Sequence, residues 1–252
     1  MPTWRLLLEY DGTLYVGWQR QPRGTSIQGR IEAALAQVLG GEAVVVHGSG
    51  RTDAGVHALG QVASFRATTV RSDRAIRMGL NSLLPRDIAC RAAFRVSDAF
   101  DALSTPHSKR YAYRILDTGE RSPLRERFTW HTRGVLDVPA MQAGARHLVG
   151  SWDFESFRAG GCSAATSLRT VRALEICRVD DEVRVEIEGD GFLRHMVRIV
   201  VGTLVQVGQG RIEPEAVARI RDARDRSLAG RTAPAAGLCL LWVDYAGADA
   251  PL

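Results

Sequence analysis

One acidic residue lies in a setting that suits chemistry on a bulky substrate. Asp53 falls inside the glycine-rich segment Gly48–His57, with glycines on both sides of the acid. Glycine lets the backbone turn sharply and lets a large substrate approach the carboxylate. The same pattern also fits an aspartate that caps a turn or a helix between two strands. Spacing alone leaves both interpretations open.

A pair of arginines could accompany this carboxylate. Arg194 and Arg198 are four residues apart, and on a helix they would share one face, where like charges repel modestly. One of them could point at a buried anion, for which Asp53 is a candidate. Alternatively, both could belong to a basic face that is exposed to solvent.

Two tyrosines lie beside basic residues in a stretch with strand character. Tyr111 and Tyr113 follow Lys109 and Arg110, and in a strand the two rings would point to the same face. An aromatic ring beside basic residues suits stacking on a base with contacts to phosphate. Ordinary core packing explains the pattern equally well.

Several common catalytic signatures are missing from the sequence. It holds no P-loop, no complete dinucleotide fingerprint, no G-x-S-x-G and no H-E-x-x-H. The histidines are scattered, and the four cysteines form no C-x-x-C pair, which argues against zinc and against a disulfide framework. Nucleotide-binding, zinc and serine-hydrolase chemistry are therefore not expected.

The composition fits a soluble globular protein that carries excess positive charge. Hydrophobic residues make up 45% and charged residues 24%, and the net charge is +5. A basic surface attracts polyanions, so the composition permits nucleic-acid binding without establishing it. No apolar run approaches the ~20 residues that span a bilayer, and the first residues do not resemble a signal peptide. We expect a cytoplasmic protein with no membrane partner.

The elements that must position these residues follow the same order twice. In the first half, strands are expected at residues 4–10, 43–47, 62–65 and 88–96. Helices are expected from a capping-box pattern at residues 25–28 to Gly40, and from Ser72 to Leu84. In the second half, strands are expected at 111–116, 171–179, 183–187 and 238–245, and helices at 138–149, 192–207 and 214–225.

This order predicts an α+β protein of two tandem βαββαβ-like subdomains, with mainly antiparallel sheets flanked by helices. We place the boundary near Thr105–Pro106. Residues 1–105 would form the N-terminal subdomain that carries Asp53. Residues 106–252 would form the C-terminal subdomain, which completes an active-site cleft between the two.

The segments taken together are similar to the tRNA pseudouridine synthase A family, and the matches run nearly from end to end. The longest and most specific is Gly50–His57. The others are Glu9–Thr13, Gly17–Gln21, Ser26–Gln28, Gly60–Val62, Arg110–Tyr113, Asp153–Arg158, Phe192 with Met196–Arg198, and Arg231–Ala235 with Gly237–Leu238.

The resemblance implies an isomerase that converts uridine to pseudouridine at positions 38, 39 and 40 in the anticodon arm of tRNA. It implies a homodimer with one tRNA lying across both subunits, and it implies neither cofactor nor metal. Asp53 would start cleavage of the N1–C1′ bond, either as a nucleophile or as a base that removes a sugar proton. Either route needs an ionised carboxylate, which an adjacent cation favours.

The resemblance also assigns roles around this carboxylate. Arg198 would pair with Asp53, Tyr111 would stack on the target base, and Arg51 would hold the nucleotide out of the helix or fill its place. The positions implied to contact RNA are Arg71, Phe100, Asp101, Ala102, Leu103, Ser104, Arg110, Gly161, Cys162, Ser163, Ala164 and Ala165. Leu103 departs from the family pattern, which usually has an arginine there, so one contact to tRNA is expected to be absent or made from elsewhere.

Two other interpretations predict different behaviour. A catalytically silent RNA-binding module would use the duplicated sheets and the basic charge, and would not need Asp53. An N-glycosidase that acts on another nucleoside would use the same carboxylate and would release a free base.

Overall fold

The computed structural model describes residues 1–104 and 106–245, and the chain forms two compact units. The first comprises Met1–His107 and the chain from Cys239 onward, and the second comprises Ser108–Leu238. The expected boundary at residue 105 lies outside the described residues. The expected second subdomain, 106–252, included the strand near residue 240, which the structure counts with the first unit. It does so because β10 (Leu238–Tyr245) pairs in parallel with the start of β3 (His57–Arg66).

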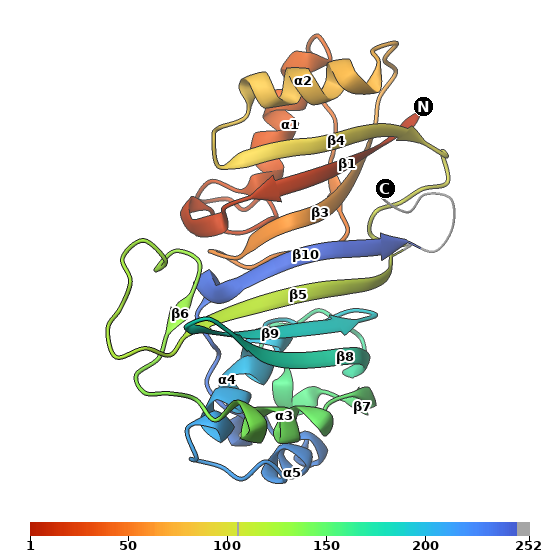
Figure 1. The fold of residues 1–252 in the computed structure, drawn as a ribbon. Helices are drawn as coiled ribbons and strands as arrows, with labels where there is room; N and C mark the ends of the chain where they lie inside the picture. Colours follow the sequence, from red (N-terminus) through yellow and green to blue (C-terminus); the bar gives the residue numbers. More distant parts are fainter. Residues whose placement is uncertain (105, 246–252) are drawn as a thin grey trace. The chain divides into compact units, whose positions relative to one another are not determined.

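The sheet of the first unit has the strand order β4-β1-β3-β10 (Figure 1). β1 (Thr3–Tyr10) runs antiparallel both to β3 and to β4 (Ile88–Val96). The short β2 (His47–Gly48) pairs with the later part of β3. Every second side chain of β1 faces the core, and Leu6 and Leu8 have no exposed surface. The alternating hydrophobic residues that predicted this strand are therefore those that face the core.

Two helices of the first unit pack against each other, and α2 also packs against β4. α1 (Ile27–Val38) begins at Ser26, whose Oγ accepts a hydrogen bond from the Gly29 N–H at 3.2 Å. The helix is confirmed, but the predicted capping box is wrong, because Ser26 and not Thr25 is the cap. The Gln28 side chain donates to the Val46 carbonyl oxygen at 3.0 Å.

The expected helix after Ser72 is confirmed as α2 (Asp73–Leu83), which buries Ile76 and Leu80 completely. Full burial of such a side chain contributes about 1.5–3 kcal/mol.

The predicted strand at residues 43–47 is wrong over most of its length, because side chains of α1 satisfy the backbone there. Besides the bond from Gln28 to its carbonyl, the Val46 N–H donates to Glu32 Oε1 at 3.0 Å. Both backbone groups of Val46 are thus used without a neighbouring strand. A hydrophobic run alone does not show whether its backbone bonds go to a strand or to side chains.

The sheet of the second unit has the order β5-β9-β8-β7, and its neighbouring strands are antiparallel. Its members are β5 (Pro106–Leu116), β9 (Glu182–Gly189), β8 (Leu168–Val179) and β7 (Gly150–Asp153). A two-residue strand, β6 (Trp130–His131), pairs in parallel with β5. The hairpin expected across Asp180–Asp181 is confirmed. Neither β6 nor β7 was predicted, because both are too short to show a period.

Helices α3 (Val138–Arg146), α4 (Met196–Gly208) and α5 (Ala216–Ala223) gather on one face of this sheet (Figure 1). α4 is buried around almost its whole circumference and packs against α3. It starts four residues later than expected, because His195 has a left-handed backbone with φ of 60°. α3 ends at residue 146, before the expected residue 149.

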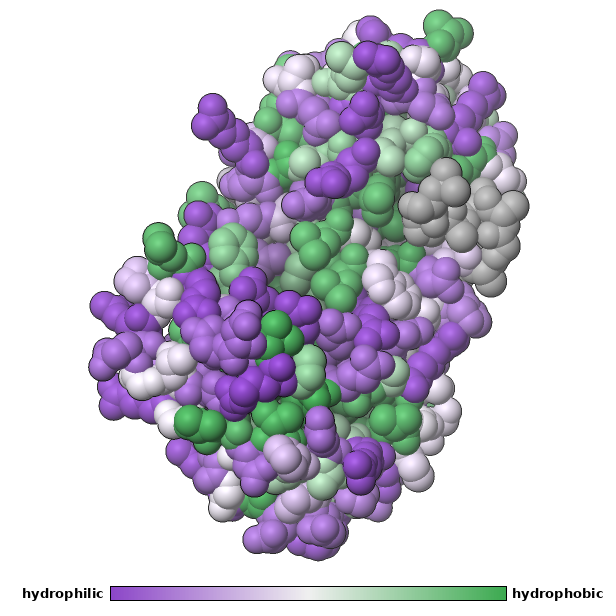
Figure 2. Space-filling view, viewed as in Figure 1, coloured by the Kyte–Doolittle hydropathy of each residue, from purple (hydrophilic) through white to green (hydrophobic). Residues whose placement is uncertain are grey.

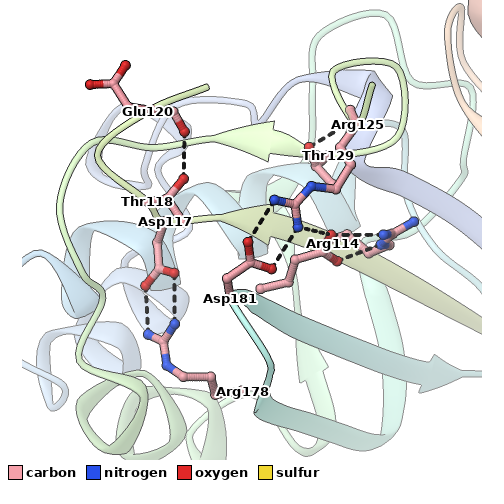
Figure 3. Close-up of polar contacts among 9 residues, drawn as sticks. Arg114, Asp117, Thr118, Glu120, Arg125, Thr129, Arg178 and Asp181 are labelled. Carbon is pink, nitrogen blue, oxygen red and sulfur yellow. Dashed lines mark hydrogen bonds and ion pairs between the residues drawn. The ribbon is translucent and has the colours of Figure 1, made fainter. Parts of the chain in front are cut away.

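Two ion pairs on the second unit tie β5 and the segment after it to the β8–β9 hairpin (Figure 3). From the segment after β5, Arg125 donates two hydrogen bonds of 2.7 Å to the Asp181 carboxylate in the turn. From β5 itself, Arg114 donates two, of 2.8 and 2.9 Å, to Glu182 at the start of β9. Such paired bonds fix the direction of a guanidinium as well as its position.

A third pair lies deeper in the same region. Arg178 donates to both oxygens of Asp117, at 2.8 and 2.6 Å, and the Leu136 N–H donates to Asp117 Oδ2 at 2.8 Å. The Asp117 side chain is 2% exposed. We call the three pairs together the hairpin clamp, whose members are Arg114, Asp117, Arg125, Arg178, Asp181 and Glu182.

The expected α+β class with mainly antiparallel strands is confirmed. Hydrophilic side chains cover much of the face shown in Figure 2, with smaller hydrophobic areas between them. Within residues 1–104 and 106–245, no helix combines the length and apolar character needed to cross a bilayer.

Candidate active site

Asp53 lies in the turn that leads into β3, and its side chain is half-buried. We call residues 49–56 the Asp53 loop. The Val56 N–H donates to the Asp53 carbonyl oxygen at 3.1 Å, which closes a tight turn around the acid. The Trp18 N–H donates to the Thr52 carbonyl oxygen at 3.0 Å and ties the loop to the segment after β1. The backbone on both sides of the carboxylate is therefore fixed.

Glycines outside the loop allow it to pack closely. A Cβ atom on Gly12 would lie 2.0 Å from the Val56 carbonyl oxygen, and one on Gly17 would lie 2.6 Å from the Thr52 carbonyl oxygen. Gly17 also has φ of 104°, which L side chains rarely adopt. Inside the loop, Gly55 has φ of 79°. The sequence singled out the glycines around Asp53, but the tightest contacts belong to the segment that packs against the loop.

His57 closes the loop at the first residue of β3 and is buried. The Gly12 N–H donates to its Nδ1 at 3.1 Å, and Asp11 Oδ1 lies 3.2 Å from the same nitrogen. Nδ1 cannot accept from Gly12 and donate to Asp11 at once. Asp11 Oδ1 also accepts from the Thr13 N–H at 3.0 Å, so the turn after β1 holds the His57 ring in place.

A buried polar network lies beneath the loop and was not predicted as part of the site. The hydroxyls of Tyr10 and Thr52 are 2.9 Å apart. Gln61 Nε2 lies 3.0 Å from the Gly50 carbonyl oxygen and 3.4 Å from the Tyr10 hydroxyl, and Ser49 Oγ donates to Gln61 Oε1 at 2.7 Å. One signal for it exists in the sequence, since Gln61 directly precedes the apolar residues Val62 and Ala63 in a predicted strand.

Tyr111 belongs to the second unit, where its ring meets that of Phe192 edge-on with centroids 5.4 Å apart. Tyr113 points to the same face, as expected, and donates to the Pro234 carbonyl oxygen at 2.7 Å. Both rings are largely buried, with 9% and 0% of their surface exposed. Burial also lowers the pKa of Lys109, two residues before Tyr111, to about 8.

Arg198 lies on the first turn of α4 and is held by a neighbouring segment. Its Nε donates to the Ala233 carbonyl oxygen at 2.8 Å, and the Ala233 N–H donates back to the Arg198 carbonyl oxygen at 3.0 Å. Gly202, one turn later, allows this close approach, because a Cβ there would lie 1.8 Å from the Arg231 carbonyl oxygen. These bonds hold the Arg198 side chain in place where it leaves α4. Its pairing with Asp53 stays a prediction.

Known proteins that are similar to this chain share one description. The family model described as tRNA pseudouridine synthase matches residues 7–102 and 145–246. The tRNA pseudouridine synthase A of Geotalea uraniireducens is 48% identical over 241 residues, which is 96% of this chain and 98% of the relative. That of Syntrophotalea carbinolica is 51% identical over 245 residues, 97% of each chain. This chain belongs to the tRNA pseudouridine synthase family.

Among solved structures, this family member aligns with one described as a Cbf5-Nop10-Gar1 complex, with a TM-score of 0.36 and 14% identity. The alignment covers 80% of this chain and 45% of that chain, and so low a TM-score supports no inference. The predicted resemblance itself is confirmed by the relatives. Asp53 and Arg198 fall within the matched segments, whereas Tyr111 lies between them.

The expectation that Arg194 and Arg198 share a helix face is wrong in this synthase. Arg194 precedes α4 and donates instead to the Gly160 carbonyl oxygen at 2.8 Å. The Ala159 N–H in turn donates to the Arg194 carbonyl oxygen, at 3.1 Å, which holds this residue outside the helix. The two arginines therefore anchor two different segments.

The predicted RNA-contacting loop Gly161–Ala165 curls around arginine side chains. Arg158 donates to the carbonyl oxygens of Cys162 and Ala164 at 3.0 and 3.1 Å. Gly161, Ser163 and Ala165 are exposed, while Cys162 and Ala164 are half-buried. The backbone of this loop is thus fixed from within, and its outer side chains reach the surface.

Arg110 faces carboxylates. It donates to Glu186 at 2.9 Å and to Glu175 at 2.7 Å, and Glu188 lies 3.6 Å away. Three negative charges around one guanidinium cancel the positive potential that would attract a phosphate. Arg110 is therefore paired with glutamates of its own sheet. This geometry does not support the predicted RNA contact.

The segment Phe100–Ser104 divides into buried and exposed members. Phe100 packs on Tyr245 with ring centroids 5.1 Å apart, and Ala102 has no exposed surface. Asp101 is half-buried and accepts a hydrogen bond from the Leu103 N–H at 2.8 Å. Leu103 is 59% exposed, and Ser104 is exposed as well. The leucine that departs from the family pattern is therefore at the surface.

The two remaining arginines of the predicted site, Arg51 and Arg71, are exposed on the first unit. Within the described part of the chain, no three His, Cys, Asp or Glu side chains lie close enough together to hold a metal ion.

Proposed function

We propose that this chain converts uridine to pseudouridine at positions 38, 39 and 40 of the tRNA anticodon arm, with Asp53 as its essential carboxylate. The observation that carries the proposal is the match to tRNA pseudouridine synthases over nearly the whole chain, which includes the Asp53 loop. The fixed backbone of this loop supports the role of the acid, because a catalytic group must be held in a defined position.

The reaction exchanges one bond for another at the same sugar carbon. The ionised Asp53 starts cleavage of the N1–C1′ bond, uracil turns over, and a C5–C1′ bond forms while C5 loses a proton and N1 gains one. The product has the same mass as the substrate. Asp53 attacks the sugar as a nucleophile or removes a sugar proton as a base, and both routes need its negative charge.

Three side chains would assist this carboxylate. Arg198 would pair with Asp53 and favour its ionised form. Tyr111 would stack on the target base, and Arg51 would hold the nucleotide out of the helix or fill its place. Extrusion of a stacked base costs a few kcal/mol, which contacts in the site would offset.

The RNA surface that we propose includes only positions that reach solvent. On the first unit these are Arg51 and Arg71, with Leu103 and Ser104 at the end of their segment. On the second unit they are the outer residues of the loop Gly161–Ala165. Phe100 and Ala102 are not included because they are buried, and Arg110 is not included because carboxylates surround it.

We further propose a cytoplasmic homodimer that binds one tRNA across both subunits and needs no cofactor. The family resemblance supports this assembly. Sedimentation velocity of the protein alone and with one tRNA per two chains would test it. A species of one chain per tRNA at micromolar concentration would contradict it.

The test of the proposed function uses tRNA that carries 5-tritiated uridine. The protein should release tritium, and nucleoside analysis by position should show pseudouridine at residues 38, 39 or 40. Asp53→Ala and Asp53→Asn should both abolish release. Asp137→Asn is the matched control, because Asp137 is an exposed cap of α3 and asparagine caps helices equally well. Full turnover by Asp53→Asn would contradict the proposed role.

The same experiment separates the alternatives. Free uracil among the products would identify an N-glycosidase, and tight binding without turnover would identify a silent RNA-binding module. Tyr113 gives that module no support, because sheet-type RNA readers stack bases on exposed rings and the Tyr113 ring has no exposed surface.

A further inference from the structure

We infer that a buried chain of hydrogen bonds, running from Ser49 through Gln61 and Tyr10 to Thr52, holds Asp53 in its working position. These four side chains would be positioning residues for the reaction. The inference rests on the proposed role of Asp53. All of them lie in the first unit, and Thr52 is directly bonded to Asp53 along the chain.

The direction of this chain follows from the amide of Gln61. The atom that faces the Gly50 carbonyl oxygen at 3.0 Å must be the nitrogen, since the reversed amide would bring two acceptors together. Gln61 Oε1 therefore faces Ser49 and accepts its hydroxyl hydrogen at 2.7 Å. Gln61 thus receives one hydrogen bond and has two hydrogens to donate.

The remaining hydrogen of Gln61 sets the orientation of Tyr10. Gln61 Nε2 lies 3.4 Å from the Tyr10 hydroxyl oxygen, so Tyr10 accepts this weaker bond. Its own hydrogen can then be donated to Thr52 Oγ1, 2.9 Å away. The hydrogen bonds therefore run without a break from Ser49 to Thr52, the residue before Asp53.

Burial makes departures from this arrangement costly. Ser49 and Gln61 have no exposed surface, and Tyr10 and Thr52 are 3% and 6% exposed. Burial also raises the pKa of the Tyr10 hydroxyl well above its usual value, so the phenol stays neutral at any working pH. A buried donor or acceptor without a partner costs about 1–3 kcal/mol. Loop conformations that break the chain are disfavoured accordingly.

The polar groups serve the loop more than the sheet. β1 and β3, which carry Tyr10 and Gln61, already pair through their backbones. A matched apolar pair could fill such a site with little change in stability, because replacing both partners of a buried hydrogen bond is often nearly neutral. Apolar side chains at positions 10 and 61 could not form hydrogen bonds to Gly50 and Thr52. The polarity at these positions therefore matters most for the loop conformation.

The first test is Tyr10→Phe, which keeps the ring beside Trp18, with centroids 6.3 Å apart, and removes the hydroxyl. We expect kcat to fall about 10- to 100-fold, because small displacements of a reacting group cost this much. The KM for tRNA should stay within about two-fold, since the RNA surface is untouched. Tyr15→Phe is the matched control. Tyr15 is also buried and donates to Asp87 at 2.6 Å, a residue outside the loop and outside the hydrogen-bonded chain, so its kcat should not change.

A second pair of variants decides the matter if Tyr10→Phe fails to fold. Thr52→Val keeps the shape of the side chain and removes the acceptor, whereas Thr52→Ser restores it. We expect Thr52→Val to lose kcat as Tyr10→Phe does, and Thr52→Ser to recover most of it. A purely structural role would lower the melting temperature of both variants without this difference in kcat.

The outcomes separate this inference from the proposed function. If Asp53→Asn is inactive while Tyr10→Phe and Thr52→Val keep kcat within about two-fold of the unmodified protein, the positioning role is wrong and the function of Asp53 stands. If Asp53→Asn is fully active, the proposed function fails, whatever the other variants do.

Discussion

The Asp53 loop and the hairpin clamp hold irregular segments in place by opposite means. The loop is fixed by neutral groups, which are its own backbone, the glycines that pack on it and the buried chain from Ser49 to Thr52. The clamp is fixed by charges, with three arginines each donating two hydrogen bonds to one carboxylate (Figure 3). The first support is buried, and much of the second faces solvent.

The difference shows how a protein can fix the backbone around a charged residue with neutral groups. Neutral hydrogen bonds orient the loop and respond little to salt or to pH. Ion pairs would orient it as firmly, but each added charge would shift the pKa of a nearby carboxylate. The proposed chemistry needs Asp53 ionised and available, and neutral support allows substrate and Arg198 to determine its electrostatics.

The largest effect is expected from crowding the loop. Gly12→Ala would place a methyl group 2.0 Å from the Val56 carbonyl oxygen, and a backbone atom cannot move away without displacing the turn around Asp53. We expect loss of at least about 100-fold in kcat, together with a lowered melting temperature. Gly119→Ala is the matched control, because a Cβ there meets no atom within 4 Å. Steady-state turnover and thermal unfolding of both variants would check this, and normal turnover by Gly12→Ala would show that the loop tolerates displacement.

A smaller effect, visible in stability and not in turnover, is expected from the buried member of the clamp. Asp117→Asn should lower the free energy of unfolding by about 1–3 kcal/mol, because Arg178 and the Leu136 N–H lose a charged acceptor. The loss is less than for a fully buried pair, since Arg178 is 35% exposed.

The pH dependence of this loss follows from the pKa of Asp117. Burial alone would raise that pKa, but the hydrogen bonds from Arg178 and Leu136 prevail and hold it below its usual value. A depressed pKa stabilises the folded state above the unfolded value of about 3.9, and this stabilisation is lost as the pH falls through the folded value. Denaturant unfolding should therefore show a constant difference in the free energy of unfolding between the unmodified protein and Asp117→Asn near neutral pH. This difference should shrink below about pH 4. A difference that persists in acid would mean that charge is not its cause.

The smallest effect is expected from the exposed member of the clamp. Arg125→Met removes the pair with Asp181, whose two side chains are 35% and 46% exposed. The melting temperature should drop only slightly, and the drop should vanish in about 1 M salt, where charges on the surface are screened. The melting temperature of Tyr10→Phe should show no such dependence on salt. If both variants respond equally to salt, the contrast between neutral and charged support is wrong.

Local patterns in the sequence predicted most elements, and they failed where a partner was distant or a segment was short. β1, β4 and β10 alternate clearly, and α1 and α2 have both a cap and a helical period, so their positions were found within a residue or two. The run at residues 43–46 looked like a strand, because nothing local shows that Glu32 and Gln28 bind its backbone.

The candidate site was predictable in its carboxylate and not in its support. Asp53 stood out by its glycine-rich setting and by the family resemblance. Gly12 and Gln61 matter because they approach the loop from other parts of the chain, and a single sequence does not record such contacts. The surroundings of Arg110 were not predictable for the same reason, since the carboxylates around it come from two other strands.

The parallel pairing of β10 with His57 and Ala58 has a consequence for how the molecule is made. A nascent chain leaves the ribosome with its early residues first, so the start of β3 must wait for its neighbour until the whole second unit has been synthesised. Contacts between such distant positions form late, because closing a long loop is entropically costly. The half that carries Asp53 is thus completed only after the second unit has been made, which would delay any capture of RNA until β10 has been synthesised.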